Sequence, residues 1–105
     1  MAKTISVSIP HRLTPAEVRA RLESALADAR RQYPQYTGAL QETWSGNTMN
    51  LRMSAMGQTI TGRVEVLPEA VQVHVDLPIF LAMLADTIRP RIEAEIRKRL
   101  SGPKA

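Results

Sequence analysis

The sequence contains no cysteine among its 105 residues, which excludes disulfides, thiolate zinc sites and cysteine nucleophiles. Its two histidines, His11 and His74, do not form the H-x-x-x-H pair of a helical zinc site. Glycine-rich phosphate loops and the G-x-S-x-G motif of serine hydrolases are also missing. The sequence therefore predicts a protein that is not an enzyme and has no catalytic residues, no cofactor and no metal site.

Long apolar runs are missing as well. No run approaches the roughly 20 residues that a membrane-spanning helix needs, and the N-terminus lacks the apolar segment of a secretory signal. Together with the lack of cysteine, this favours the cytoplasm. Hydrophobic residues make up 44% of the chain, enough for one core, and the length predicts a single domain over 1–105 whose end, 101–105, frays.

Alternation of apolar and polar residues predicts five strands. Residues 4–9 alternate between Ser or Thr and Ile or Val, as in a strand with one buried face, and Pro10 ends the pattern. Residues 49–55, 60–66 and 71–77 alternate in the same way, and residues 38–44 do so less regularly. Short turns that contain glycine or proline separate these segments, so we expect an antiparallel meander.

Two helices complete the predicted order. Thr14 has the features of an N-cap, Pro15 suits the first helical position, and Glu17 completes a capping box for a helix that ends near Tyr33. A single long helix is expected from Pro78 onward. Its apolar stripe, predicted to contact the core, is Leu81, Leu84, Ile88, Ile92, Ile96 and Leu100.

The predicted fold class is therefore α+β, a two-layer sandwich in the order β-α-β-β-β-β-α. Its sheet is mainly antiparallel, and both helices pack on one face so that every amphipathic surface is covered. The opposite, polar face of the sheet is expected to carry Arg52, Arg63, Glu65, Gln72, His74 and Asp76.

Methionine and tryptophan suggest where an apolar ligand could bind. Met49, Met53 and Met83 could line a pocket between the sheet and the C-terminal helix, because methionine adapts to irregular apolar shapes. Plain core filling explains the same residues. Trp44, which precedes a turn, is expected to anchor a hairpin to the core with its indole N–H satisfied at the rim.

The C-terminal segment is basic. Residues 89–105 hold six basic side chains against two acidic ones, a net charge of +4. Arg97, Lys98 and Arg99 could therefore contact an anionic partner. Aromatic residues make up only 4% of the chain and none lies nearby to stack on bases, so nucleic acid is the less favoured partner. A solvated helix end whose cations suit the helix dipole explains the cluster equally well.

One combination of local features is specific to a known family. Its parts are Ile5-x-Val7-x-Ile9, Leu13-Thr14, Trp44-Ser45-Gly46-Asn47, Gly57, Gly62-Arg63-Val64-Glu65-Val66, Val71-x-Val73-x-Val75-x-Leu77-Pro78 and Arg99-Leu100. Over roughly residues 5–100 the chain resembles the small bacterial polyhydroxyalkanoic acid system proteins. The resemblance implies a cytoplasmic protein whose gene lies near those for carbon-storage granules. It carries over no catalytic residue, because none is established for the family.

The leading hypothesis is thus a non-enzymatic accessory or binding protein of the polyhydroxyalkanoate granule system, in contact with granule-associated proteins or the granule surface. It is not expected to be a granule-coating phasin, because it lacks a long, strongly apolar helix free of a sheet partner. The alternatives are a carrier of a small apolar ligand and, more weakly, a protein that binds anionic surfaces or nucleic acid. Exposed edge strands make a homodimer a further expectation.

Overall fold

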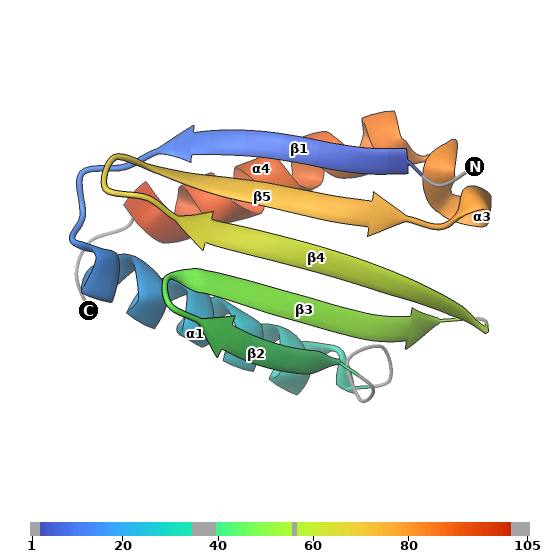
Figure 1. Ribbon diagram of the computed structural model, residues 1–105, viewed down its shortest axis with the longest axis horizontal. Helices are drawn as coiled ribbons and strands as arrows, with labels where there is room; N and C mark the ends of the chain where they lie inside the picture. Colours follow the sequence, from blue (N-terminus) through green and yellow to red (C-terminus); the bar gives the residue numbers. More distant parts are fainter. Residues whose placement is uncertain (1–2, 35–39, 56, 102–105) are drawn as a thin grey trace.

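The computed structural model describes residues 3–34, 40–55 and 57–101 (Figure 1). The elements in chain order are β1 (Lys3–Pro10), α1 (Pro15–Gln32), β2 (Gln41–Ser45), β3 (Thr48–Ala55), β4 (Gln58–Val66), β5 (Ala70–Leu77), α3 (Ile79–Ala82) and α4 (Ala85–Ser101). The predicted strand at 38–44 thus appears as β2 from Gln41 onward, while residues 38–39 lie outside the described residues. So do residues 102–105, most of the end predicted to fray.

The strands form one antiparallel sheet in the order β1-β5-β4-β3-β2. The meander from β2 to β5 is confirmed, and the N-terminal strand joins it beside β5, where Val7 lies opposite Val73. At the β2–β3 turn Gly46 has a φ of +60°, in the left-handed region that favours glycine. This order leaves β1 and β2 at the two edges of the sheet.

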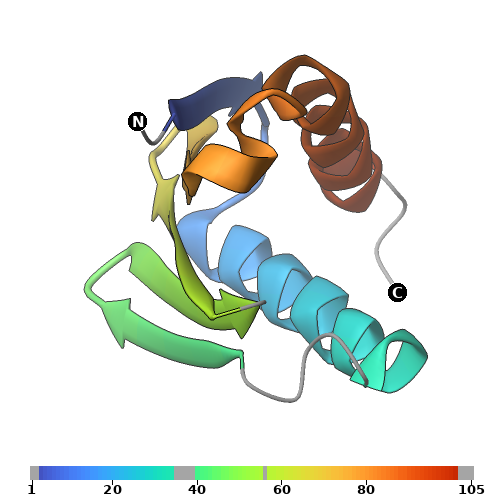
Figure 2. The ribbon, with the colours of Figure 1, turned by 90° about the vertical axis from the view of Figure 1, so that its right-hand side faces the viewer.

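Both helices cover the same face of the sheet, as predicted (Figures 1 and 2). α4 packs against β1, α1 packs against β4, and the two helices contact each other. The fully buried centre of the core consists of Ile5, Ile9, Val18 and Val71. The register pairs Arg63 with His74 on the opposite face. The α+β two-layer fold is therefore confirmed.

The start of α1 also follows the prediction. The Thr14 hydroxyl accepts the backbone N–H of Glu17 at 3.2 Å, and a Glu17 carboxylate oxygen accepts the N–H of Thr14 at 3.0 Å. Pro15 occupies the first turn, where its missing N–H leaves no bond unmade. One turn on, Val18 has no solvent-exposed surface, so this cap places the buried side of α1 on the sheet.

The C-terminal helix differs from the prediction, because it is broken into α3 and α4. The chain turns at Met83 and Leu84, where the Leu84 N–H donates to the Leu81 carbonyl. β5 and α4 run in opposite directions, and the short helix α3 lies in the connection between Leu77 and Ala85 where the chain reverses (Figure 1). Leu84, expected in the core stripe, is 46% exposed as a result.

The remainder of the predicted stripe does contact the core. Leu100 is buried, while Leu81, Ile88, Ile92 and Ile96 are half-buried against the core cluster. α4 therefore lies on the sheet through a mostly half-buried row of side chains.

Candidate functional site

Apolar side chains gather on the surface where α3 turns into α4. Ile79 is 68% exposed, Met83 87%, Leu84 46% and Phe80 36%. We call these four residues the apolar cluster. The whole segment from Leu77 to Ala85 contains no charged residue. Exposed large apolar side chains are unusual when they are contiguous, so the apolar cluster is a candidate contact surface.

Local sequence explains why these side chains face solvent. Pro78 is buried and holds an extended backbone (φ −67°, ψ 166°) just before α3. α3 has only four residues, so it presents one turn to the sheet and the other side chains to solvent. Leu81 packs against the core, and its neighbours Phe80 and Ile79 are left outside.

The basic residues near the end of α4 do not form one free patch. Arg99 lies between two carboxylates, with its Nη1 2.6 Å from Asp28 of α1 and its Nε 3.0 Å from Glu95. In addition, Arg21 of α1 donates to the Arg99 carbonyl at 2.9 Å. Arg99 therefore ties α4 to α1 and is half-buried, whereas the sequence predicted a mostly solvated side chain; its contact with an anionic partner stays a prediction.

Arg97 and Lys98 remain at the surface. Arg97 is 52% exposed and pairs with Glu93 one turn earlier, at 2.8 Å. Lys98 is exposed and has no charged partner in the part of the chain that the structure describes. Arg97 is thus already paired, and Lys98 is the exposed cation beside it. Two such side chains can contact few phosphates, so they would bind a polyanion such as nucleic acid only weakly.

The ion pair between the helices affects the pKa of both groups. The hydrogen bond from Arg99 lowers the pKa of the Asp28 carboxyl from its ordinary value of 3.8, and the nearby Arg31 contributes to this shift. The same hydrogen bond raises the pKa of Arg99. Both shifts show that the charged forms are stabilised by the fold.

The three methionines predicted to line an apolar pocket differ widely in exposure. Met49 is a core residue, 3% exposed, at the start of β3, and Met53 is half-buried near the end of that strand. Met83 is 87% exposed and belongs to the apolar cluster. Neither of the two pockets lined by residues 10–13, 97, 100 and 101 or by residues 16, 19, 20, 23 and 47 contains any of the three, so the methionine pocket stays a prediction.

His74 lies on the polar face of the sheet, as expected. Its Nδ1 is 2.9 Å from the Ser6 hydroxyl, and its Nε2 is 3.6 Å from a Glu65 carboxylate oxygen. A serine, a histidine and a carboxylate in a row also occur in hydrolases. Here the neighbouring positions on β4 and β5 hold the charged residues Arg63 and Asp76. The arrangement is a surface hydrogen-bond network between strands.

Asp76 belongs to the same polar face. It accepts hydrogen bonds from Thr4 at 2.6 Å and from Thr61 at 3.1 Å, and these bonds lower its pKa. No group of three or more histidine, aspartate or glutamate side chains among the described residues is placed to hold a metal ion.

Trp44 anchors the β2–β3 hairpin, as predicted. It is half-buried against the core, its indole N–H donates to Glu42 at 3.0 Å, and the Arg19 guanidinium lies 4.3 Å from the centre of its ring. Because both its polar atom and its ring face have partners within the chain, Trp44 is explained by the fold.

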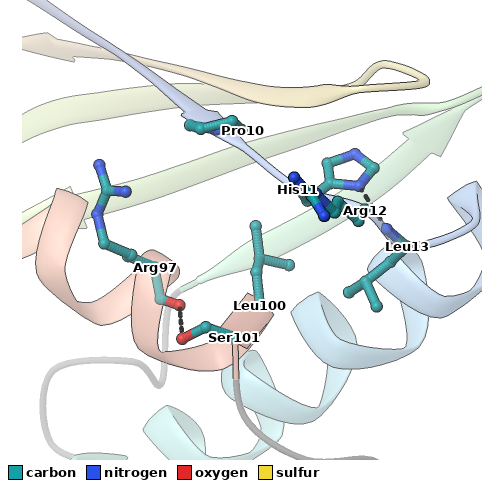
Figure 3. Close-up of a pocket in the computed structure, with 7 residues that line it drawn as sticks. All are labelled: Pro10, His11, Arg12, Leu13, Arg97, Leu100 and Ser101. Carbon is teal, nitrogen blue, oxygen red and sulfur yellow. Dashed lines mark hydrogen bonds between the residues drawn. The ribbon is translucent and has the colours of Figure 1, made fainter.

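A pocket opens where the end of β1 meets the end of α4 (Figure 3). It has a volume of about 430 Å³ and is lined by residues 10–13 together with Arg97, Leu100 and Ser101. Sequence analysis did not find this pocket, because its two segments lie more than 80 residues apart in the chain. The sequence signal at each segment was a basic residue, Arg12 or Arg97, close to a leucine.

The family of the chain follows from a comparison with known proteins. The family model described as "Putative polyhydroxyalkanoic acid system protein" matches residues 5–100. The chain belongs to this family. No curated protein matches the chain. Among solved structures, the crystal structure of Ara h 8.0201 covers 95% of each chain with 10% sequence identity and a TM-score of 0.38, a likeness too low to bear on function.

Membership of the polyhydroxyalkanoic acid system family limits the functions to consider. The family match brings no catalytic assignment with it. Within the described ranges, none of the helices is long and apolar enough to cross a membrane. Among the described residues, the apolar cluster at α3 and the pocket beside α4 are two candidate contact surfaces of this family member.

Proposed function

We propose that this protein is a non-enzymatic accessory protein that attaches to polyhydroxyalkanoate granules in the bacterial cytoplasm through its apolar cluster. The observation that carries the proposal is the exposure of Ile79, Phe80, Met83 and Leu84 in a member of the polyhydroxyalkanoic acid system family. The partner is the surface of the polyester itself.

The chemistry of the two surfaces is complementary. A polyester of hydroxy acids carries no charge along its chain, and the segment from Leu77 to Ala85 carries none either. Contact between them therefore removes apolar area from water without desolvating a charge. Burial of a large apolar side chain is worth about 1.5–3 kcal/mol, so Ile79 and Met83 together would contribute about 3 kcal/mol. A contribution of this size corresponds to a factor of roughly 150 in affinity.

The position of the apolar cluster also suits attachment. α3 lies at one end of the molecule, beyond the end of β5, whereas the end of α4 and the β1–α1 connection lie at the other end (Figure 1). A protein attached through α3 would keep its polar sheet face and the pocket beside α4 open to solvent. This supports an accessory role in which the far end remains free to bind something else.

Sedimentation with protein-free polyhydroxybutyrate particles tests the proposal. We expect the wild-type protein to pellet with the particles, and the double variant Ile79→Ser, Met83→Ser to bind at least about tenfold more weakly. Leu67→Ser is the matched control, because Leu67 is also an exposed apolar residue (37%) but lies in the β4–β5 turn at the other end of the sheet. Its binding should equal that of the wild type.

Two results would contradict the proposal. One is a wild-type protein that stays in the supernatant, and the other is a double variant that binds as well as Leu67→Ser. Uncharged phospholipid vesicles serve as the specificity control. If the wild-type protein binds vesicles as well as it binds polyhydroxybutyrate particles, it has a general affinity for apolar surfaces. In cells, a fluorescent fusion should follow the granules only when Ile79 and Met83 are intact.

A further inference from the structure

The pocket beside α4 has one cationic side and one apolar side. Arg12 is exposed and has no hydrogen-bond or charged partner among residues 3–34, 40–55 and 57–101. Arg97 uses one nitrogen, Nη2, to bind Glu93, so its guanidinium keeps further N–H donors. In Figure 3, Leu100 lies between Arg97 on one side and the segment from His11 to Leu13 on the other. The pocket therefore combines guanidinium groups with an aliphatic base.

His11 forms a fixed wall of this pocket. The Leu13 backbone N–H donates to its Nδ1 at 3.1 Å. Its Nε2 lies 2.9 Å from the Leu67 carbonyl oxygen. Both ring nitrogens thus have partners within the chain. His11 holds the β1–α1 connection in place and leaves anion binding to Arg12 and Arg97.

We propose that this pocket binds the carboxylate of a small aliphatic acid. The guanidinium of Arg12, unpaired among the described residues, holds the carboxylate through charge-assisted hydrogen bonds, Arg97 on the other side of the pocket adds positive charge, and the short carbon chain lies on Leu13 and Leu100. A volume of about 430 Å³ is within the range of small-molecule sites and leaves room for an acid of a few carbon atoms. The proposal goes beyond granule attachment, which uses the opposite end of the molecule.

The charge of the pocket disfavours a neutral ligand. A neutral apolar molecule would leave the guanidinium of Arg12 without a partner, and its desolvation would oppose binding. A phosphate could satisfy the arginines, but it would gain nothing from Leu13 and Leu100.

Titration of the ¹⁵N-labelled full chain with butyrate, 3-hydroxybutyrate, inorganic phosphate and uncharged methyl butyrate tests the proposal. We expect both carboxylates to shift the amides of residues 11–13 and 97–101 saturably, with a dissociation constant on the order of millimolar. Phosphate should bind more weakly, and methyl butyrate should cause no saturable shift.

Two variants separate site binding from general charge. Arg12→Gln should weaken carboxylate binding by about fivefold to tenfold, because it removes charge-assisted hydrogen bonds. Arg52→Gln is the matched control: it removes the same charge from an exposed position on the other face of the sheet and should leave binding unchanged. Circular dichroism checks that both variants are folded.

Each of three outcomes would overturn the proposal. They are an equal loss of binding in Arg12→Gln and Arg52→Gln, shifts by methyl butyrate that match those by butyrate, and phosphate binding as tight as that of butyrate. The assay contains no granules or polymer. Its result therefore stands apart from the sedimentation experiment, and either proposal can fail alone.

Discussion

The side chain of Leu22 offers a direct test of how α1 stabilises this fold. Leu22 is 4% exposed and packs in the core cluster next to Val18 of the same helix. Leu22→Ala removes three carbon atoms from this site and leaves a cavity that the sheet on one side and the helix backbone on the other cannot fill. We expect the free energy of unfolding to fall by about 2–4 kcal/mol. A domain of this length has about 5–15 kcal/mol in total, so the loss is large.

Thermal and urea unfolding followed by circular dichroism measures this loss. A decrease of about 3 kcal/mol lowers the Tm of a domain of this size by roughly 10–20 °C. Leu84→Ala makes the same chemical change at a side chain that is 46% exposed, and should lower stability by less than about 1 kcal/mol. Ile92→Ala, at a half-buried position of α4, should fall between the two.

The ranking of these three variants is the critical result. If Leu22→Ala and Leu84→Ala lose the same stability, burial in this structure does not determine the energetics, and the packing of α1 on the sheet would have to be rejected. An unchanged urea m-value is also required, since it shows that the variants unfold from the same compact state.

Three further predictions concern local interactions. The folded pKa of Asp28 is lowered by Arg99, so its contribution to stability is present above pH 3.8 and is lost as the pH falls through the folded pKa. Asp28→Asn should therefore have a lower Tm than the wild type at pH 6, and the difference should shrink below pH 4; a difference that is constant with pH would contradict the ion pair. Thr14→Ala removes the N-cap hydrogen bond of α1 and should lower the free energy of unfolding by about 1 kcal/mol in urea titrations, with Thr14→Ser restoring most of it. Gly46→Ala forces a side chain into a left-handed conformation and should lower stability by about 1–2 kcal/mol, whereas no change would mean that the β2–β3 turn has another conformation.

The candidate contact surfaces contain features that the sequence alone did not predict. The run from Leu77 to Ala85 was visible as apolar sequence, and helical spacing placed Leu84 in a core stripe. Periodicity along one helix does not show that the helix breaks where the chain reverses direction after β5. Likewise, the basic character of Arg99 was visible, but its partner Asp28 lies 71 residues away and could not be identified by spacing.

Local patterns alone determined most of the secondary structure of this protein. Each of these patterns depends on a few neighbouring residues: the cap at Thr14, the period-two alternation in the strands and the turns that contain glycine. The local sequence is therefore enough to predict them. Only the tertiary structure decided that β1 lies beside β5, that Arg99 pairs with Asp28 and that Arg12 and Arg97 share a pocket. These features join segments that are far apart in the chain. They depend on how the two helices share one face of a twisted sheet, and no local pattern carries that information.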